Sequence, residues 1–143
     1  MMTILRIVIA LILVGHGIGH IMGFLETWTN WQPFADPSFN DSPWIFSDGI
    51  YIDSAVGKVF GTFWLFAMIG FFVSAIGLAT NQSWWSIVAI IASILSLFAV
   101  IPWWNTFTPG IISKKSAVVV DIIILVLLLG PWKDVLLDRL SSR

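Results

Sequence analysis

Long runs of apolar residues, separated by short polar stretches, make up most of the chain. Four runs have about the length that a helix needs to cross the hydrocarbon core of a bilayer, roughly 20 residues. They cover residues 4–25, 54–79, 84–103 and 116–132. The last run is the shortest and ends at Gly130-Pro131, which is a helix stop signal. The pattern predicts an all-α fold, a four-transmembrane-helix bundle that forms a single membrane domain over residues 1–143.

Tryptophan pairs and a short turn support this division of the chain. Trp84-Trp85 and Trp103-Trp104 bracket the third run, and tryptophan favours the two membrane interfaces. A helix between the two pairs would be roughly 27 Å long at 1.5 Å per residue, which is close to the thickness of the hydrocarbon core. Residues 80–83 predict a tight turn, so the second and third helices should form a hairpin.

Two segments outside the runs are more than simple connections. Residues 26–53 are rich in aromatic and acidic side chains, so we expect a structured loop that caps the bundle between the first and second helices. Residues 133–143 place leucine and valine at helical spacing, which predicts a short amphipathic helix on the membrane surface. The loop contains five of the eight acidic residues, namely Glu26, Asp36, Asp41, Asp48 and Asp53.

Composition is that of an integral membrane protein. The chain is 58% hydrophobic and 10% charged, whereas a soluble domain has about 25% charged residues, and its mean hydropathy is +0.94. We therefore expect a multi-pass protein with the lipid bilayer as its surroundings. The net charge of -1 gives no basic surface for nucleic acid. The absence of cysteine excludes disulfides, thiolate metal ligands and thiol redox chemistry by this chain.

The distribution of basic residues favours an arrangement with both termini inside. The terminal side has four basic residues and the opposite side three, and positive charge favours the cytoplasmic face. The first apolar run is longer than that of a typical signal peptide and lacks a small-x-small cleavage site, so we expect it to be retained as a helix. The two sets are Arg6, Lys133, Arg139 and Arg143, against Lys58, Lys114 and Lys115.

Two histidines and one aspartate fall inside the apolar runs. His16 and His20, the only histidines, lie in the first run, and ionisable groups at membrane depth usually face a bundle interior or a functional path. Their i, i+4 spacing puts both on one helix face, from which two imidazoles can reach one metal ion. Asp121 has wholly apolar flanks, where an unpaired carboxylate would take up a proton or attract a cation. All three should lie in the half of the bilayer nearer the long loop.

These positions predict a metal site formed by His16, His20 and Asp121, with Glu26 and Lys58 as neighbours. Two histidines and a carboxylate suit zinc, non-haem iron or copper. Haem is less favoured, because both histidines come from one helix. The alternative is structural: each histidine could fasten the bundle by bonding to the next helix, and Asp121 could pair with Lys58 or with a histidine. Lys58 could instead extend its ammonium group to the membrane surface.

The segment His16-Gly17-Ile18-Gly19-His20, the acidic first loop and Asp121 in the last run together resemble a known group. They are similar to the small four-helix prokaryotic membrane proteins called DoxX-like, and the resemblance is one of architecture over most of the chain. It implies a place in the prokaryotic cytoplasmic membrane and a role as a membrane subunit in thiol or quinone oxidation. Because cysteine is absent, only the quinone-linked or auxiliary role is compatible with this chain alone.

Three functions are compatible with these features. The first is a buried polar site that binds a metal ion, a proton or a polar ligand head, with an enzyme acting on an apolar substrate as one form of it. The second is a non-catalytic accessory subunit that associates with other subunits of a larger redox-type membrane complex. The third, least favoured, is transport of protons or small solutes by a homo-oligomer, because four spans are few for a transporter and no inverted repeat is visible.

Overall fold

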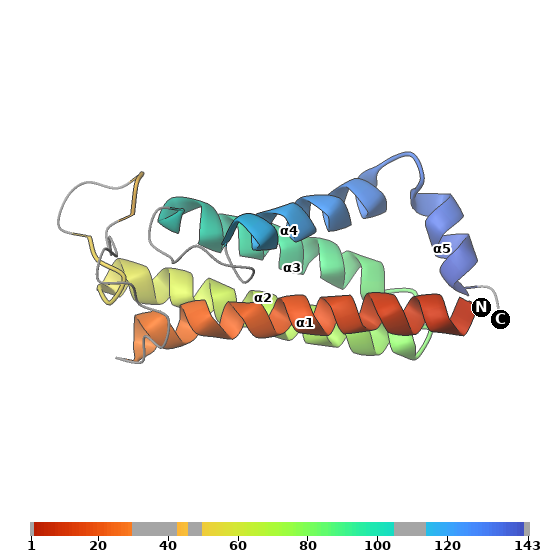
Figure 1. Ribbon diagram of the computed structural model, residues 1–143, viewed down its shortest axis with the longest axis horizontal. Coiled ribbons are helices and arrows are strands. Elements are labelled where there is room, and N and C mark those ends of the chain that lie inside the picture. Colours follow the sequence, from red (N-terminus) through yellow and green to blue (C-terminus); the bar gives the residue numbers. More distant parts are fainter. Residues whose placement is uncertain (1, 30–42, 46–49, 105–113, 142–143) are drawn as a thin grey trace.

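The fold of the described residues is entirely helical. The computed structural model describes residues 2–29, 43–45, 50–104 and 114–141. Helices α1 to α4 run along the long axis of the molecule as a bundle, and α5 folds across one end of it (Figure 1). The all-α prediction is confirmed for this part of the chain. The elements are α1 (Met2–Trp28), α2 (Ala55–Ala79), α3 (Trp85–Val100), the 3₁₀ turn η1 (Ile101–Trp103), α4 (Lys114–Leu129) and α5 (Lys133–Ser141).

Three of these helices are long and apolar enough to cross a membrane. They are α1, α2 and α3 continued by η1; a fourth span exists only if α4 and α5, which meet at an angle of 91°, count as one broken span. Helix α4 has 16 residues and is roughly 24 Å long, shorter than the ~30 Å hydrocarbon core. The break lies at Gly130-Pro131, where the sequence predicts a helix stop.

The second and third helices form the predicted hairpin. Helix α2 ends at Ala79 and α3 begins at Trp85. Asn81 between them has a φ of 58°, a left-handed conformation that asparagine adopts more readily than most residues. At the other end of α2, the Gly57 N–H donates to the Ser54 hydroxyl over 3.2 Å, so Ser54 caps the helix at the predicted start.

Glycine allows α1 and α2 to approach closely. A Cβ atom added at Gly23 would lie 2.3 Å from the indole ring of Trp64, and one added at Gly61 would lie 1.8 Å from the Thr27 hydroxyl oxygen. Neither distance is possible for real atoms, so any larger residue would push the helices apart. These two glycines therefore have the packing role that small residues have in membrane bundles.

The first helix continues beyond its predicted end at residue 25. Glu26, predicted to lie in the loop, is in the last turn of α1 and only 4% exposed. The Thr27 hydroxyl donates to the carbonyl of Gly23, and the Trp28 indole N–H donates to the Lys58 carbonyl over 3.1 Å. The Thr27 bond lies within α1, whereas the Trp28 bond reaches α2 and holds the final turn of α1 against it.

The described part of the long loop packs on the end of the bundle. The backbone N–H of Trp44 donates to the Pro102 carbonyl over 3.2 Å. Ile52 is buried in an apolar cluster with Trp64 and Trp103. Residues 30–42 and 46–49 lie outside the described residues, so the prediction of a structured cap is tested only at these contacts.

Helix α5 confirms the helix predicted near the C-terminal end and returns toward the start of α1 (Figure 1). Leu140 is 2% exposed and belongs to the same apolar cluster as Leu13 of α1. The Arg6 guanidinium donates from Nε to the Leu140 carbonyl. The start of α1 and the end of α5 therefore meet at one end of the bundle.

Candidate metal centre

Helix α4 directs its single carboxylate into the bundle. Asp121 is 0% exposed, whereas its neighbours Val119, Ile122 and Ile123 are about half exposed. This is the reverse of a helix in a soluble protein, whose polar face meets water. An ionisable residue that faces inward from an apolar helix is the arrangement expected for a functional or paired group in a membrane.

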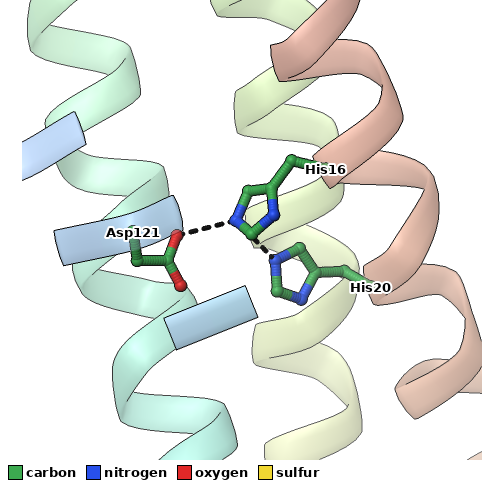
Figure 2. A group of neighbouring side chains, drawn as sticks. All are labelled: His16, His20 and Asp121. Carbon is green, nitrogen blue, oxygen red and sulfur yellow. Dashed lines mark hydrogen bonds and ion pairs between the residues drawn. The ribbon is translucent and has the colours of Figure 1, made fainter. Parts of the chain in front are cut away.

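Helix α1 brings both histidines to this carboxylate. His16 and His20 project from one face of α1 toward Asp121 on α4 (Figure 2), as their i, i+4 spacing requires. The Nε2 atom of His16 lies 2.8 Å from Oδ1 of Asp121. One ligand atom from each of the three residues lies within 4.8 Å of the other two, so the group can hold a metal ion. The structure thus brings together the three residues that the sequence predicts as ligands.

A third helix adds a serine to the group. The Ser96 hydroxyl, on α3, donates to Oδ2 of Asp121, and its oxygen lies 3.1 Å from Nε2 of His20. Because the serine hydrogen is directed at the carboxylate, we assign the hydrogen of the second contact to His20 Nε2, which then donates to Ser96. By the same reasoning His16 Nε2 donates to Asp121. His20, Ser96, Asp121 and His16 form one continuous chain of side-chain contacts.

The two imidazoles also approach each other, so the four side chains form a closed cycle of contacts. Their Nε2 atoms are 3.5 Å apart, and the ring centroids are 4.9 Å apart with the planes almost perpendicular. A separation of 3.5 Å is long for a hydrogen bond, and with the assignment above both nitrogens carry hydrogen. The contact is therefore best described as two nitrogens that converge on the same small space beside the carboxylate.

Phe71 of α2 forms the apolar wall of the site. Its side chain is fully buried, stacks on His20 at a centroid distance of 5.7 Å and meets His16 edge-on at 4.6 Å. Gly17, between the two histidines in sequence, lies against this part of α2, because a Cβ there would be 3.2 Å from Phe71 Cβ. The phenyl ring restricts the orientation of both imidazoles and excludes water from that side.

Ser93 lies beside this cycle of four side chains but is not part of it. It is on the same buried face of α3 as Ser96 and is 0% exposed. Its hydroxyl is near the Asp121 carboxylate, but within the described residues it has no hydrogen-bond partner in good geometry.

The site is deeper in the bundle than the predicted helix ends imply. Because α1 ends at Trp28, His20 is roughly 12 Å from that end, and Glu26 is roughly 9 Å farther along the helix than His20. Lys58 is exposed, with Nζ 5.9 Å from the centre of the Trp28 ring. The group that can hold a metal ion consists of His16, His20 and Asp121, and a role for Glu26 and Lys58 as its neighbours stays a prediction.

Sequence reasoning did not find two of the residues that complete the site. Ser96 belongs to the stripe of small residues on α3, which indicates a bundle-facing side but not a specific contact. Phe71 has no distinguishing signal, because phenylalanine is frequent throughout α2. Both residues become part of the site only through the packing of helices that are far apart in sequence.

The site therefore combines two imidazoles, a carboxylate and a hydroxyl from three helices, with a phenyl wall from a fourth. All are enclosed by apolar segments, so the group is a small polar site inside an apolar bundle. Inference about its function depends on this geometry. No protein-family model, curated protein or solved structure matches the chain.

Proposed function

We propose that this chain binds one transition-metal ion, zinc by preference, through His16, His20 and Asp121 within the membrane. The observation that carries the proposal is the 3.5 Å separation of the two Nε2 atoms. Two imidazoles on a tetrahedral zinc ion, with Zn–N bonds near 2.0–2.1 Å, have their nitrogens about 3.3 Å apart.

The charge of the site also supports a bound cation. Asp121 is fully buried, and a carboxylate in an apolar environment is costly unless a cation or several hydrogen bonds compensate it. To bind zinc through Nε2, each histidine would carry its hydrogen on Nδ1 instead. The Nε2 atom of His16 and Oδ1 of Asp121, 2.8 Å apart in the structure, would then separate by about 0.5 Å to reach tetrahedral spacing. Such a shift is within the reach of side-chain rotation alone.

The proposed arrangement in the membrane has four spans, with α4 and α5 counted as one span broken at Gly130-Pro131. Contact between Arg6 of α1 and Leu140 of α5 supports it, because an even number of crossings returns the chain to its starting side. The small excess of basic residues at that end favours an inside location. In this arrangement the metal site lies in the half of the bilayer nearer the long loop.

Metal content of the purified protein tests the proposal. The full chain is purified with a histidine-free tag, without imidazole or chelator, and loaded with zinc, iron(II) or copper before elemental analysis. We expect close to one zinc ion per chain in the wild type, and loss of this ion in His20→Ala and Asp121→Ala. Asp53→Ala, which removes an exposed carboxylate, is the matched control and should retain the metal. A wild-type protein that takes up no stoichiometric metal would refute the proposal.

A further inference from the structure

Ser96 forms a hydrogen bond with one of the two oxygens of the Asp121 carboxylate. Its hydroxyl donates to Oδ2, while Oδ1 faces His16. Both residues of this contact are 0% exposed, so no water competes for Oδ2. Hydrogen bonds of this kind orient metal-binding carboxylates in many metalloproteins. Here the bond directs Oδ1 alone toward the space shared by the two imidazoles.

A carboxylate held in this way supplies a metal with a single oxygen. With one nitrogen from each histidine, the protein then provides three ligands. Zinc is usually four-coordinate, and three protein ligands with one open position are the pattern of reactive zinc sites, whereas structural sites have four protein ligands. If Oδ2 were released, the carboxylate could bind through both oxygens and fill the remaining position.

The charge of a metal-loaded site determines what the open position prefers. A divalent ion with two neutral imidazoles and one carboxylate keeps one positive charge. The surroundings are the Phe71 ring and the apolar segments of α1 and α4, where an uncompensated charge is costly. A fourth ligand with one negative charge would cancel it, whereas the neutral Ser96 hydroxyl would not, and water would do so only after losing a proton to become hydroxide.

His16 lies at the outer edge of the site. Its side chain is 7% exposed, whereas that of Asp121 is 0% exposed and His20 is buried. Cβ atoms added at Gly15 or Gly19, on the surface of α1, would have no neighbour within 4 Å. A small ion would therefore approach the site past the edge of the His16 ring.

Resting on the metal site proposed above, we infer that Ser96 is a positioning residue that keeps Asp121 a one-oxygen ligand. The metal then retains a fourth position, which binds a small monovalent anion. The chemical class of ligand is thus an anion such as azide, or the ionised oxygen of a molecule that enters from the membrane.

Cobalt(II) in place of zinc tests the inference, because its visible absorption reports coordination number and ligand type. The full chain in detergent is loaded with cobalt and titrated with sodium azide. For the wild type we expect tetrahedral bands that shift with azide and saturate at one azide per cobalt. This titration requires no substitution and therefore tests the open position directly.

Ser96→Ala tests the role of the serine. We expect weaker cobalt binding, by about 10–100-fold, together with an azide affinity at least tenfold lower, because the freed Oδ2 closes the fourth position. Ser86→Ala removes another buried hydroxyl from α3 at a distance from the site and should leave both values unchanged.

The possible results separate this inference from the proposed function. If the wild type binds neither cobalt nor zinc, the proposed metal site itself is refuted. A wild type that binds cobalt without any azide response, while Ser96→Ala does respond, would show that Ser96 is itself the fourth ligand. Equal cobalt and azide affinities in the wild type and Ser96→Ala would refute the positioning role.

Discussion

Asp121 accepts hydrogen bonds from two helices other than its own, one from His16 of α1 and one from Ser96 of α3. This single residue therefore fastens three helices together in addition to any ligand it binds. Removing one partner leaves the other buried and unsatisfied, which costs more than the net value of the bond. Measured side-chain hydrogen bonds between membrane helices are modest, about 0.6 kcal/mol on average and up to about 1.7, so we expect coupling at the upper end of that range.

A double-mutant cycle between His16→Ala and Asp121→Ala should show this coupling. We expect an interaction energy of about 1–2 kcal/mol in the metal-free protein, because the second substitution removes a group that the first has already left without its partner. The free energy of unfolding would be measured in mixed micelles with chelator present. A cycle between Asp121→Ala and Ser74→Ala, whose hydroxyl bonds to the Trp85 carbonyl, should be additive within about 0.5 kcal/mol. Additivity in the first cycle would contradict the prediction.

At the scale of the helices, α1 carries two kinds of glycine. Gly23 is in the interface with α2, where a Cβ would meet the Trp64 ring at 2.3 Å, whereas Gly15 has open space around it. The regular spacing of glycines along α1 suggests one packing stripe from sequence, but only part of that stripe is in contact with another helix of the chain. Substitutions by alanine should distinguish the two kinds.

We expect Gly23→Ala to destabilise the protein by about 1–3 kcal/mol, because the added methyl group must displace the Trp64 ring or separate the helices. Gly15→Ala, in the same helix, should be neutral or stabilising by less than about 1 kcal/mol, since alanine favours helix and no neighbour obstructs it. Thermal unfolding of both variants in detergent measures the difference. Equal effects of the two substitutions would argue against the close contact at Gly23.

At the scale of the whole molecule, the arrangement of the spans depends on α4. The other long helices can each cross a bilayer alone, whereas α4 is short and turns by 91° into α5. Helix α5 nevertheless returns to the start of α1 through the Arg6–Leu140 contact. Whether α4 completes a fourth crossing decides on which side α5 lies.

Single cysteines can determine this topology, because the chain has no cysteine of its own. Asp53→Cys, Asn81→Cys and Asp138→Cys are at exposed positions and would be labelled with a membrane-impermeant maleimide in intact cells and in inverted vesicles. We expect Asn81→Cys and Asp138→Cys to react from the same side, inside, and Asp53→Cys from the other. Labelling of Asp138→Cys together with Asp53→Cys would show that α4 does not cross.

Much of the helical organisation could be predicted from local sequence. The start of α2 follows from the capping side chain of Ser54, and the hairpin and the break at Gly130-Pro131 follow from turn and stop signals. The end of α1 could not be placed in the same way, because the contact of Trp28 with the Lys58 carbonyl that holds its last turn belongs to the tertiary structure. The apolar pattern therefore predicts Glu26 in the loop, whereas it is in the last turn of α1.

The sequence by itself determined that His16, His20 and Asp121 lie in long apolar segments that form helices. Such segments suit a bilayer, where a chain without water must satisfy its backbone in helices whose length is set by the hydrocarbon core. Only the tertiary structure decided which faces meet. When a helix is apolar on all sides, its sequence does not indicate which side faces the other helices. Contacts between segments that are distant in sequence determine this orientation. Those contacts placed Ser96 and Phe71 beside the histidines and left Lys58 at the surface.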